Sequence, residues 1–316
     1  MRVAVVGAGI SGLSCALRLA EAGHRVEVVA AEPPHATTSA VAAAIWYPYR
    51  ALPQRQVTRW AALGYSVLAE MARRTSTGVR LLPGRELLRA SMGEPWWRDA
   101  VPELRRVPPA ELPVGFRGGW ALTVPVVDMG VHLPWLLAQV QRRGVRLAVR
   151  RLESLTGAAP HADVVVDCAG LGARELATDP SVQPVRGQVV VVGQVGLREW
   201  LLVQDDPVAL TYVVPRERSV VLGGVAEDGA ECMDADAATA RAVLARCVAL
   251  VPALAGAPVL EHKVGLRPAR PAVRVEAGRL SSGQPVVHDY GHGGAGVTLA
   301  YGCAPDVVAL VEATGG

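Results

Sequence analysis

The hydrophobic pattern at the start of the chain predicts a βαβ unit. Arg2–Val6 is a short apolar run, as expected of a strand buried on both faces of a parallel sheet. A glycine-rich turn follows. From Leu13 to Ala22 the apolar residues recur with helical spacing, and Gly23 is the predicted helix cap. Arg25–Ala30 then forms the second apolar strand.

The middle of the chain predicts strands of two kinds. Val131–Arg143 is predicted as a helix and Asp163–Cys168 as another buried strand. By contrast, Val185–Val192 and Ser219–Gly224 are typical of antiparallel strands, and residues 81–120 are rich in Pro, Gly and Trp. Because the two kinds of strand interleave, we expect the chain to cross between two domains more than once.

The last part of the chain returns to the first pattern. Pro285–His288 is a predicted strand, residues 291–296 form a glycine loop, and Val297–Glu312 is a predicted closing helix. The free N–H groups at the start of such a helix favour negative charge.

Composition excludes several classes of protein. Hydrophobic residues make up 51% of the 316 residues, which favours a folded core over disorder. The net charge of +3 is too small to indicate a nucleic-acid surface, and no uninterrupted apolar run has transmembrane length. The five cysteines lack metal-ligand spacing, so we expect reduced thiols, no metal and a cytoplasmic location.

The turn after the first strand is a dinucleotide-binding fingerprint of the form GxGxxG. The first glycine allows the tight turn, the second lets the backbone approach a pyrophosphate, and the third allows close helix–strand packing. An acid after the second strand, Glu32, is placed to hold the adenosine ribose, although a solvated acid ahead of two prolines would look the same. The motif does not separate NAD from FAD. Its residues are Gly7, Ala8, Gly9, Ile10, Ser11 and Gly12.

The segment from Thr37 to Tyr49 is small, apolar and free of glycine, and it ends in an aromatic cluster. It resembles the segment of D-amino-acid oxidases and D-aspartate oxidases that lines the flavin and its pyrophosphate. The resemblance implies that Thr37, Thr38 and Ser39 serve the phosphates or ribitol, and that Ala43, Ala44 and Ile45 pass beside the isoalloxazine. Ala44 stands where the family usually has glycine.

Two further segments resemble signatures of the same family. Residues 264–271 (VGLRPARP) are similar to its arginine–proline signature, and residues 289–298 (DYGHGGAGVT) to its glycine-loop signature. Smaller matches occur in family order over essentially the whole chain. The fingerprint is shared by many flavoproteins, whereas these two signatures together are specific.

The resemblance implies a substrate site. Arg267 would clamp the substrate carboxylate, since a guanidinium binds a carboxylate with two parallel hydrogen bonds. Tyr212 would make the second carboxylate contact, and the Gly294 carbonyl would receive the amino group. Gly293, Gly294, Gly296, Val297 and Thr298 would bind the cofactor, with Thr298 at the pyrimidine edge of the flavin. His292 would support the flavin region rather than act as a base.

The fold class implied is α/β, with a Rossmann-like FAD-binding domain and an interleaved antiparallel-sheet α+β substrate domain. The FAD-binding domain is expected at residues 1–50, 131–185 and 262–316, and the substrate-binding domain at 51–130 and 186–261.

The segment from Asp206 and Pro207 to Tyr212 is shorter than in mammalian-type enzymes of the family. The resemblance therefore implies a truncated active-site lid and product release that does not limit turnover.

The implied activity is oxidative deamination of D-amino acids with non-covalent FAD. A hydride passes from the substrate Cα to flavin N5, and O2 as acceptor yields hydrogen peroxide, a 2-oxo acid and ammonia. Alternatives are D-aspartate oxidase, a glycine- or sarcosine-type FAD amine oxidase, and a flavin- or NAD-binding module without turnover. The sequence leaves open the preferred side chain, the oligomeric state, the affinity for FAD and the roles of Arg274 and Arg270. Arg216 and Arg218 are either a basic pocket for D-aspartate or charged turn residues.

Overall fold

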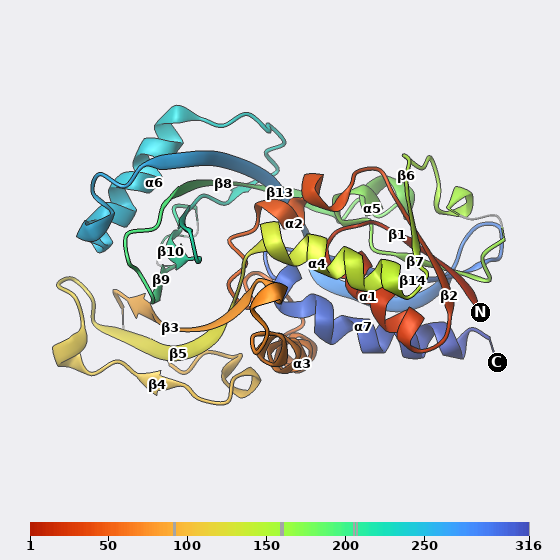
Figure 1. Cartoon of the computed structure of the whole chain (residues 1–316), viewed down its shortest axis with the longest axis horizontal. Helices are drawn as coiled ribbons and strands as arrows, with labels where there is room; N and C mark the ends of the chain where they lie inside the picture. The colour runs from red at the N-terminus through yellow and green to blue at the C-terminus, as the bar shows by residue number, and fades with distance from the viewer. Residues whose placement is uncertain (91–92, 159–160, 205, 207, 316) are drawn as a thin grey trace.

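The computed structural model describes residues 1–90, 93–158, 161–204, 206 and 208–315. Its strands are β1 (Arg2–Val6), β2 (Arg25–Ala30), β3 (Val79–Leu88), β4 (Arg105–Arg106), β5 (Gly118–Val127), β6 (Arg146–Val149), β7 (Val164–Asp167), β8 (Gln183–Gly193), β9 (Trp200–Val203), β10 (Thr211–Pro215), β11 (Ser219–Gly223), β12 (Glu227–Asp228), β13 (Val259–Arg279) and β14 (Pro285–His292). Its helices are α1 (Ile10–Glu21), α2 (Thr38–Val41), α3 (Gln54–Met71), α4 (Met129–Arg142), α5 (Ala173–Leu176), α6 (Ala237–Leu250) and α7 (Gly296–Ala313). The described strands join in the order β4-β5-β3-β9-β10-β11-β8-β13-β14-β7-β1-β2-β6, with β12 beside β8 (Figure 1).

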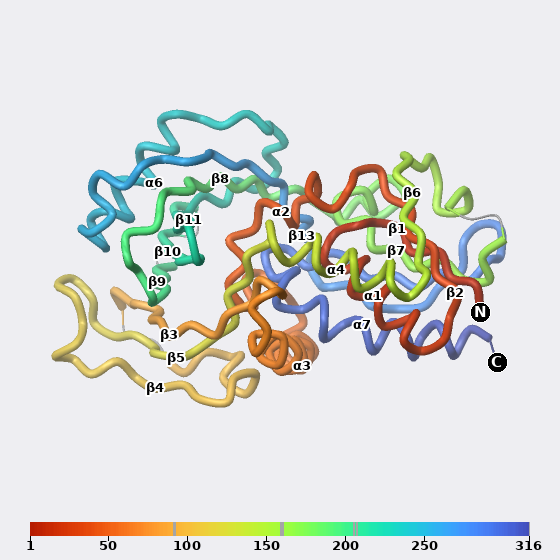
Figure 2. The backbone as a smooth tube through the Cα atoms, viewed as in Figure 1, coloured from red at the N-terminus to blue at the C-terminus, as the bar shows by residue number. Residues whose placement is uncertain are grey.

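One end of the sheet is parallel. Strands β14, β7, β1, β2 and β6 pair in parallel, and β1, α1 and β2 form the predicted βαβ unit. Val3, Val5 and Val28 are almost fully buried here, which explains the unbroken apolar runs. Both chain ends lie at this end of the molecule, far from β3 and β5 (Figure 2).

The other end is mainly antiparallel. Strands β9, β10, β11, β8 and β13 pair antiparallel in that order, as do β3 and β5. The exception is β3 with β9, which are parallel, with Glu86 opposite Leu202. This mixture confirms the predicted α/β class with a second, antiparallel sheet region.

The long strand β13 connects the two regions. Its first half pairs with β8, and after an irregularity between Ala269 and Arg274 its second half pairs with β14. The proposed domain boundaries near residues 185 and 262 fall within β8 and β13. The division into two domains stays a prediction.

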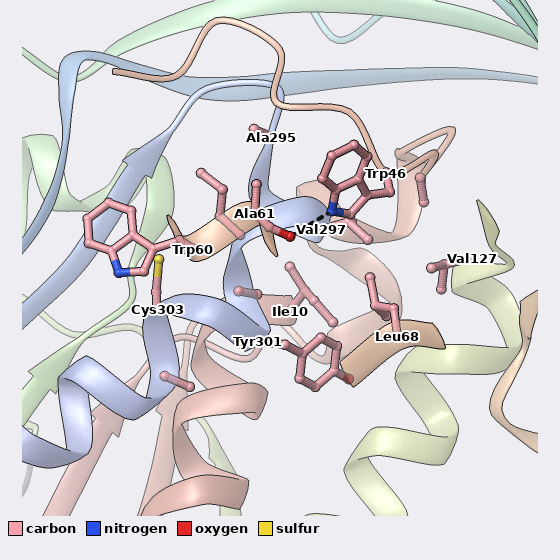
Figure 3. Packing of buried hydrophobic residues seen from close by; sticks show 14 of the residues in the cluster. Ile10, Trp46, Trp60, Ala61, Leu68, Val127, Ala295, Val297, Tyr301 and Cys303 are labelled. Carbon is pink, nitrogen blue, oxygen red and sulfur yellow. Dashed lines mark hydrogen bonds between the residues drawn. The ribbon is translucent and has the colours of Figure 1, made fainter. Parts of the chain in front are cut away.

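The main core lies where α1, α3 and α7 pack together (Figure 3). Ile10 of α1, Leu68 of α3 and Tyr301 of α7 are all almost fully buried in it. Among the described helices, only α7 has the length and the apolar composition of a helix that could cross a membrane. However, 56% of it is buried and it contacts both other helices, as a core helix of the fold does.

The predicted elements are all present, and their ends differ from the prediction by at most four residues. The glycine loop is shorter than predicted, because Gly291 and His292 continue β14. Helices α3 and α6 and the full extent of β13 were not predicted. Pro268 and Pro271 obscured β13, since proline removes a ladder donor and argues against a strand interior.

Candidate active site

A cavity of about 430 Å³ runs from the fingerprint turn to the ends of β9 and β10, within the usual range for ligand sites of roughly 300–1,000 Å³. The predicted site residues that line it are Gly7, Ala8, Gly9, Ile10, Ser11, Glu32, Thr37, Thr38, Ser39, Ala43, Ala44, Ile45, Tyr212, Arg267, Gly293, Gly294, Gly296 and Val297. Gly12 and Thr298 do not line it. The structure therefore brings together segments that are up to 290 residues apart, from Gly7 to Val297.

The fingerprint glycines have the expected geometry. Gly7 has a φ of +113°, and a Cβ there would lie 2.3 Å from the Cys168 carbonyl oxygen, so only glycine fits the turn. A Cβ on Gly12 would lie 2.0 Å from the Gly7 carbonyl oxygen. Gly12 thus acts through helix–strand packing, which accounts for its absence from the cavity wall.

The start of α1 is open toward the cavity. Gly9 is its N-cap and no side chain caps the helix, although the Ile10 N–H donates to Ser39 Oγ at 3.0 Å. Uncapped N–H groups and the positive end of the helix dipole suit a pyrophosphate. Glu32 lies exposed two residues beyond β2, and its contact with a ribose stays a prediction.

The segment from Thr37 to Ile45 lies along the cavity between the fingerprint and β13. Thr37 Oγ1 donates to the Pro34 carbonyl at 2.8 Å and Thr38 Oγ1 to the Leu266 carbonyl at 3.1 Å. Ala44 has a φ of +57°, a left-handed conformation that glycine favours. The chain therefore keeps the glycine-like backbone at this position despite the alanine.

The side chain of Thr298 is used within the protein. Its hydroxyl accepts from the Tyr47 N–H at 2.9 Å and lies 3.0 Å from the Tyr47 carbonyl, to which it donates. Only 1% of Thr298 is exposed. These bonds fix the start of α7 against the aromatic segment, and a direct contact with the flavin stays a prediction.

Arg267 and Tyr212 meet at the other end of the cavity. Arg267 Nη1 donates to the Val225 carbonyl at 3.1 Å, and its guanidinium lies against Gly187, where a Cβ would clash at 2.5 Å. Tyr212 is buried, and burial raises the pKa of its hydroxyl while the nearby Arg267 lowers it. The phenol therefore stays protonated and can donate to a carboxylate.

Tyr49 completes this end of the cavity, although the sequence assigned it no role. Its ring lies against Gly294, where a Cβ would be 2.4 Å from Cδ1 and 3.5 Å from Arg267 Cδ. Its buried hydroxyl has no hydrogen-bond partner among the described residues. Burial raises its pKa, with Arg50 and Arg267 opposing. Tyr49 therefore lines the cavity beside Arg267, and its place in the aromatic cluster was the only signal in the sequence.

Behind the glycine loop lies a buried group of thiols and one carboxylate. Cys15 Sγ donates to Asp289 Oδ2 at 3.2 Å, and His292 Nε2 lies 3.1 Å from Asp289 Oδ1. A hydrogen bond with Cys168 and burial raise the pKa of Cys15 well above its usual value. The potential ligand atoms are close enough for a metal, but metals bind thiolates, which this environment disfavours.

The arginines whose roles the sequence did not decide include three that form hydrogen bonds within the protein. Arg270 Nε donates to Asp179 Oδ2 at 2.8 Å, and Arg274 Nη1 to Tyr290 Oη at 2.5 Å, so both anchor β13 to its surroundings. Arg216 Nη2 donates to the Ala42 carbonyl at 2.9 Å, and Arg216 does not line the cavity that contains Arg267. Arg218 is exposed in the same turn. Neither forms the basic pocket considered as an alternative.

The short segment before Tyr212 is described only in part, because Pro207 lies outside the described residues. Asp206 Oδ1 accepts from the Val208 and Ala209 N–H groups at 2.8 and 2.9 Å, and the Val208 carbonyl accepts from Ala226 N–H at 3.0 Å. These bonds hold the described part of the segment in a turn.

Residues 2–310 match the family described as FAD dependent oxidoreductase (DAO). The chain belongs to this family. The cofactor of the DAO family, FAD, fits a cavity with an uncapped helix start at one end and an apolar segment along its length. The chain is 52% identical to "D-amino-acid oxidase" of Rubrobacter xylanophilus, over 99% of this chain and 96% of that protein.

Other relatives of the DAO family extend the comparison. The chain is 46% identical to "D-amino-acid oxidase" of Streptomyces coelicolor, over 98% of this chain and 96% of that protein. It is 36% identical to "D-aspartate oxidase" of Homo sapiens, over 98% of this chain and 94% of that protein. The structure of glycine oxidase from Geobacillus kaustophilus has the same fold, with a TM-score of 0.82, 20% identity and coverage of 99% and 95%.

Proposed function

We propose that the chain is an FAD-dependent D-amino-acid oxidase that uses O2 as electron acceptor. The observation that carries this proposal is the group of Arg267, Tyr212 and Tyr49 at one end of a cavity whose other end is the dinucleotide fingerprint. The relatives from Rubrobacter xylanophilus and Streptomyces coelicolor, both named D-amino-acid oxidase, support it over the full chain.

The residues of this chain orient the substrate. Arg267 binds the carboxylate with its fixed fork of donors, and the Tyr212 hydroxyl donates a further hydrogen bond. The Gly294 carbonyl accepts from the substrate amino group. With the carboxylate and the amino group held, only one enantiomer can turn its Cα–H to the cofactor while its side chain takes the remaining space. When bound, FAD would supply the redox chemistry, with O2 as the electron acceptor.

The charges of the cavity favour a D-amino-acid oxidase over a D-aspartate oxidase. Arg267 is the only arginine or lysine among the described residues that line the cavity. A substrate with two carboxylates would place the second one without a cation, and burying an unpaired charge is costly. This supports neutral over acidic D-amino acids.

An oxygen-consumption screen over D- and L-amino acids tests the proposal. We expect D-alanine and D-methionine to be oxidised with a higher kcat/KM than D-aspartate, and the yellow protein to bleach anaerobically with D-amino acids only. Faster oxidation of D-aspartate would favour the alternative oxidase. Flavin that no amino acid reduces would overturn the proposed function.

We also propose that FAD is held without a covalent bond. His292 lines the cavity, but its Nε2 lies 3.1 Å from Asp289 Oδ1, whereas Cys303 is part of the α7 core rather than of the cavity wall. Acid precipitation should leave the yellow colour in the supernatant, and colour retained on the denatured chain would refute this. A cytoplasmic location stays a prediction, which cell fractionation would test.

A further inference from the structure

A second cavity lies behind the segment of residues 42–45. Its volume is about 1140 Å³, and it is bounded by the end of α3, the starts of β3 and α4, and the turn between β10 and β11. We call it the rear cavity, and the cavity that contains Arg267 the front cavity. The two share no lining residue in the described part of the chain.

Arg216 is the buried charge of the rear cavity. It is 8% exposed, and its side chain makes one hydrogen bond to the described residues, from Nη2 to the Ala42 carbonyl at 2.9 Å. Its Nε has no partner among them, and Nη1 lies 3.7 Å from Asp128 Oδ1, beyond hydrogen-bond distance. Asp128 instead caps α4, accepting from the Gly130 N–H at 3.1 Å. A buried guanidinium keeps its charge, and its unused donors are costly unless an anion accepts from them.

The rest of the lining suits an anion with an apolar body. Leu81 of β3 and Val131 of α4 line the rear cavity and are 40% and 44% exposed. Arginines outnumber acids four to three among the described lining residues, so the surrounding charge does not oppose an anion. The volume also exceeds what a bare inorganic ion fills. We therefore expect a ligand with an acidic group for Arg216 and a chain of several carbon atoms.

The rear cavity is coupled to the front cavity through one layer of backbone. Ala42, whose carbonyl accepts from Arg216, lines the front cavity. Val126 of β5 lines the rear cavity and pairs with Ile45, which lines the front cavity. The segment that lines the predicted flavin site is therefore held from behind by Arg216 and β5.

We propose that the rear cavity binds a small organic anion of the acyl carboxylate type, and that this binding tightens the binding of FAD. The carboxylate accepts from Arg216 Nη1, and the acyl chain lies on Leu81 and Val131. Fixing the guanidinium fixes its bond to the Ala42 carbonyl, so less freedom is lost when FAD binds against this segment. The coupling is reciprocal, so FAD also strengthens binding of the anion. The inference requires FAD binding, but neither a particular substrate nor turnover.

Calorimetry with octanoate tests the site. The Arg267→Ala holoenzyme is used, because it lacks the predicted carboxylate site of the front cavity. Octanamide has nearly the same shape without the charge, and acetate has the charge without the chain. We expect octanoate to bind roughly tenfold more tightly than either, since it alone makes both contacts. Equal affinity for octanamide would mean adsorption to an apolar surface and would overturn the proposal.

Further substitutions in the same background locate the ligand. Arg216→Gln should weaken octanoate binding roughly tenfold. Arg218→Gln is the matched control, because Arg218 is exposed in the same turn and lines neither cavity. Leu81→Glu, at an exposed position, places a negative charge in the rear cavity and should weaken binding even if Arg216→Gln does not fold. Unchanged octanoate affinity in Leu81→Glu, or in folded Arg216→Gln, would overturn the proposal.

The effect on FAD is measured by diluting the holoenzyme and recording the fluorescence of released flavin. With octanoate we expect the Kd for FAD to fall roughly fivefold in Arg267→Ala and in Arg267→Ala/Arg218→Gln. It should change less than about twofold in Arg267→Ala/Arg216→Gln. A Kd that rises with octanoate would mean competition within the front cavity. That result, or an unchanged Kd in Arg267→Ala with octanoate bound, would overturn the coupling, whereas D-amino-acid oxidation is tested separately by the oxygen-consumption screen.

Discussion

The two ends of the cavity are built in different ways. At the cofactor end the backbone forms the surface, since residues 7–12 and the start of α1 present N–H groups and leave little room for side chains. At the substrate end side chains form it, and Arg267, Tyr212 and Tyr49 come from β13, β10 and a loop. Substitutions should therefore act through packing and cofactor loss at the first end, and through substrate affinity at the second.

The largest effect is expected for Arg267→Ala. Losing a charge-assisted bidentate contact costs about 3 kcal/mol, or roughly 100-fold in kcat/KM. Flavin should remain bound, because the fingerprint is untouched. Arg267→Lys should recover only part of the activity, since an ammonium lacks the planar fork. Exposed Arg279 of the same strand provides the control, Arg279→Ala. Near wild-type kcat/KM for Arg267→Ala would contradict the claim that side chains at the substrate end determine substrate affinity.

The second effect should appear in stability and cofactor content. In Gly12→Ala the new Cβ would lie 2.0 Å from the Gly7 carbonyl oxygen, a contact with backbone that cannot give way cheaply. Overpacking of this kind costs about 1–3 kcal/mol. We expect a lower Tm and a lower FAD-to-protein ratio, with unchanged KM in the molecules that keep FAD. A raised KM with full flavin content would contradict the packing role.

The difference between the ends also explains what the sequence could predict. The cofactor end is local, so the run of residues 2–12 shows strand, turn and helix directly, and β1 and α1 are where they were predicted. The substrate end is not local. Tyr49 meets Gly294 only because α7 packs under the aromatic segment, and Glu86 meets Gln204 only because β3 pairs with β9. No spacing in the sequence shows such contacts, and only family resemblance pointed to Arg267 and Tyr212.

A smaller effect is expected for Tyr212→Phe. The ring stays packed and one hydroxyl hydrogen bond is lost, which costs about 1–2 kcal/mol. The loss should fall mainly on KM, as expected of a group that binds the carboxylate equally before and during reaction. Tyr65→Phe is a matched control, because Tyr65 donates to the Thr123 carbonyl at 3.0 Å outside the cavity. A fall in kcat with constant KM would place Tyr212 in the chemical step instead.

The smallest effect returns to the cofactor end and has the opposite sign. Ala44 has a φ of +57°, and an alanine in that conformation costs about 1–2 kcal/mol relative to glycine. Ala44→Gly removes this strain but gives the unfolded chain more freedom, which offsets about 0.4–1 kcal/mol. We expect a net gain of up to about 1 kcal/mol, a rise in Tm of roughly 2 °C. Ala245→Gly at an exposed position within α6 should lower stability by about 1 kcal/mol, since glycine is a poor helix former. If both glycine variants lowered the Tm equally, the left-handed backbone at Ala44 would not be strained. The cofactor end would then tolerate alanine as readily as glycine.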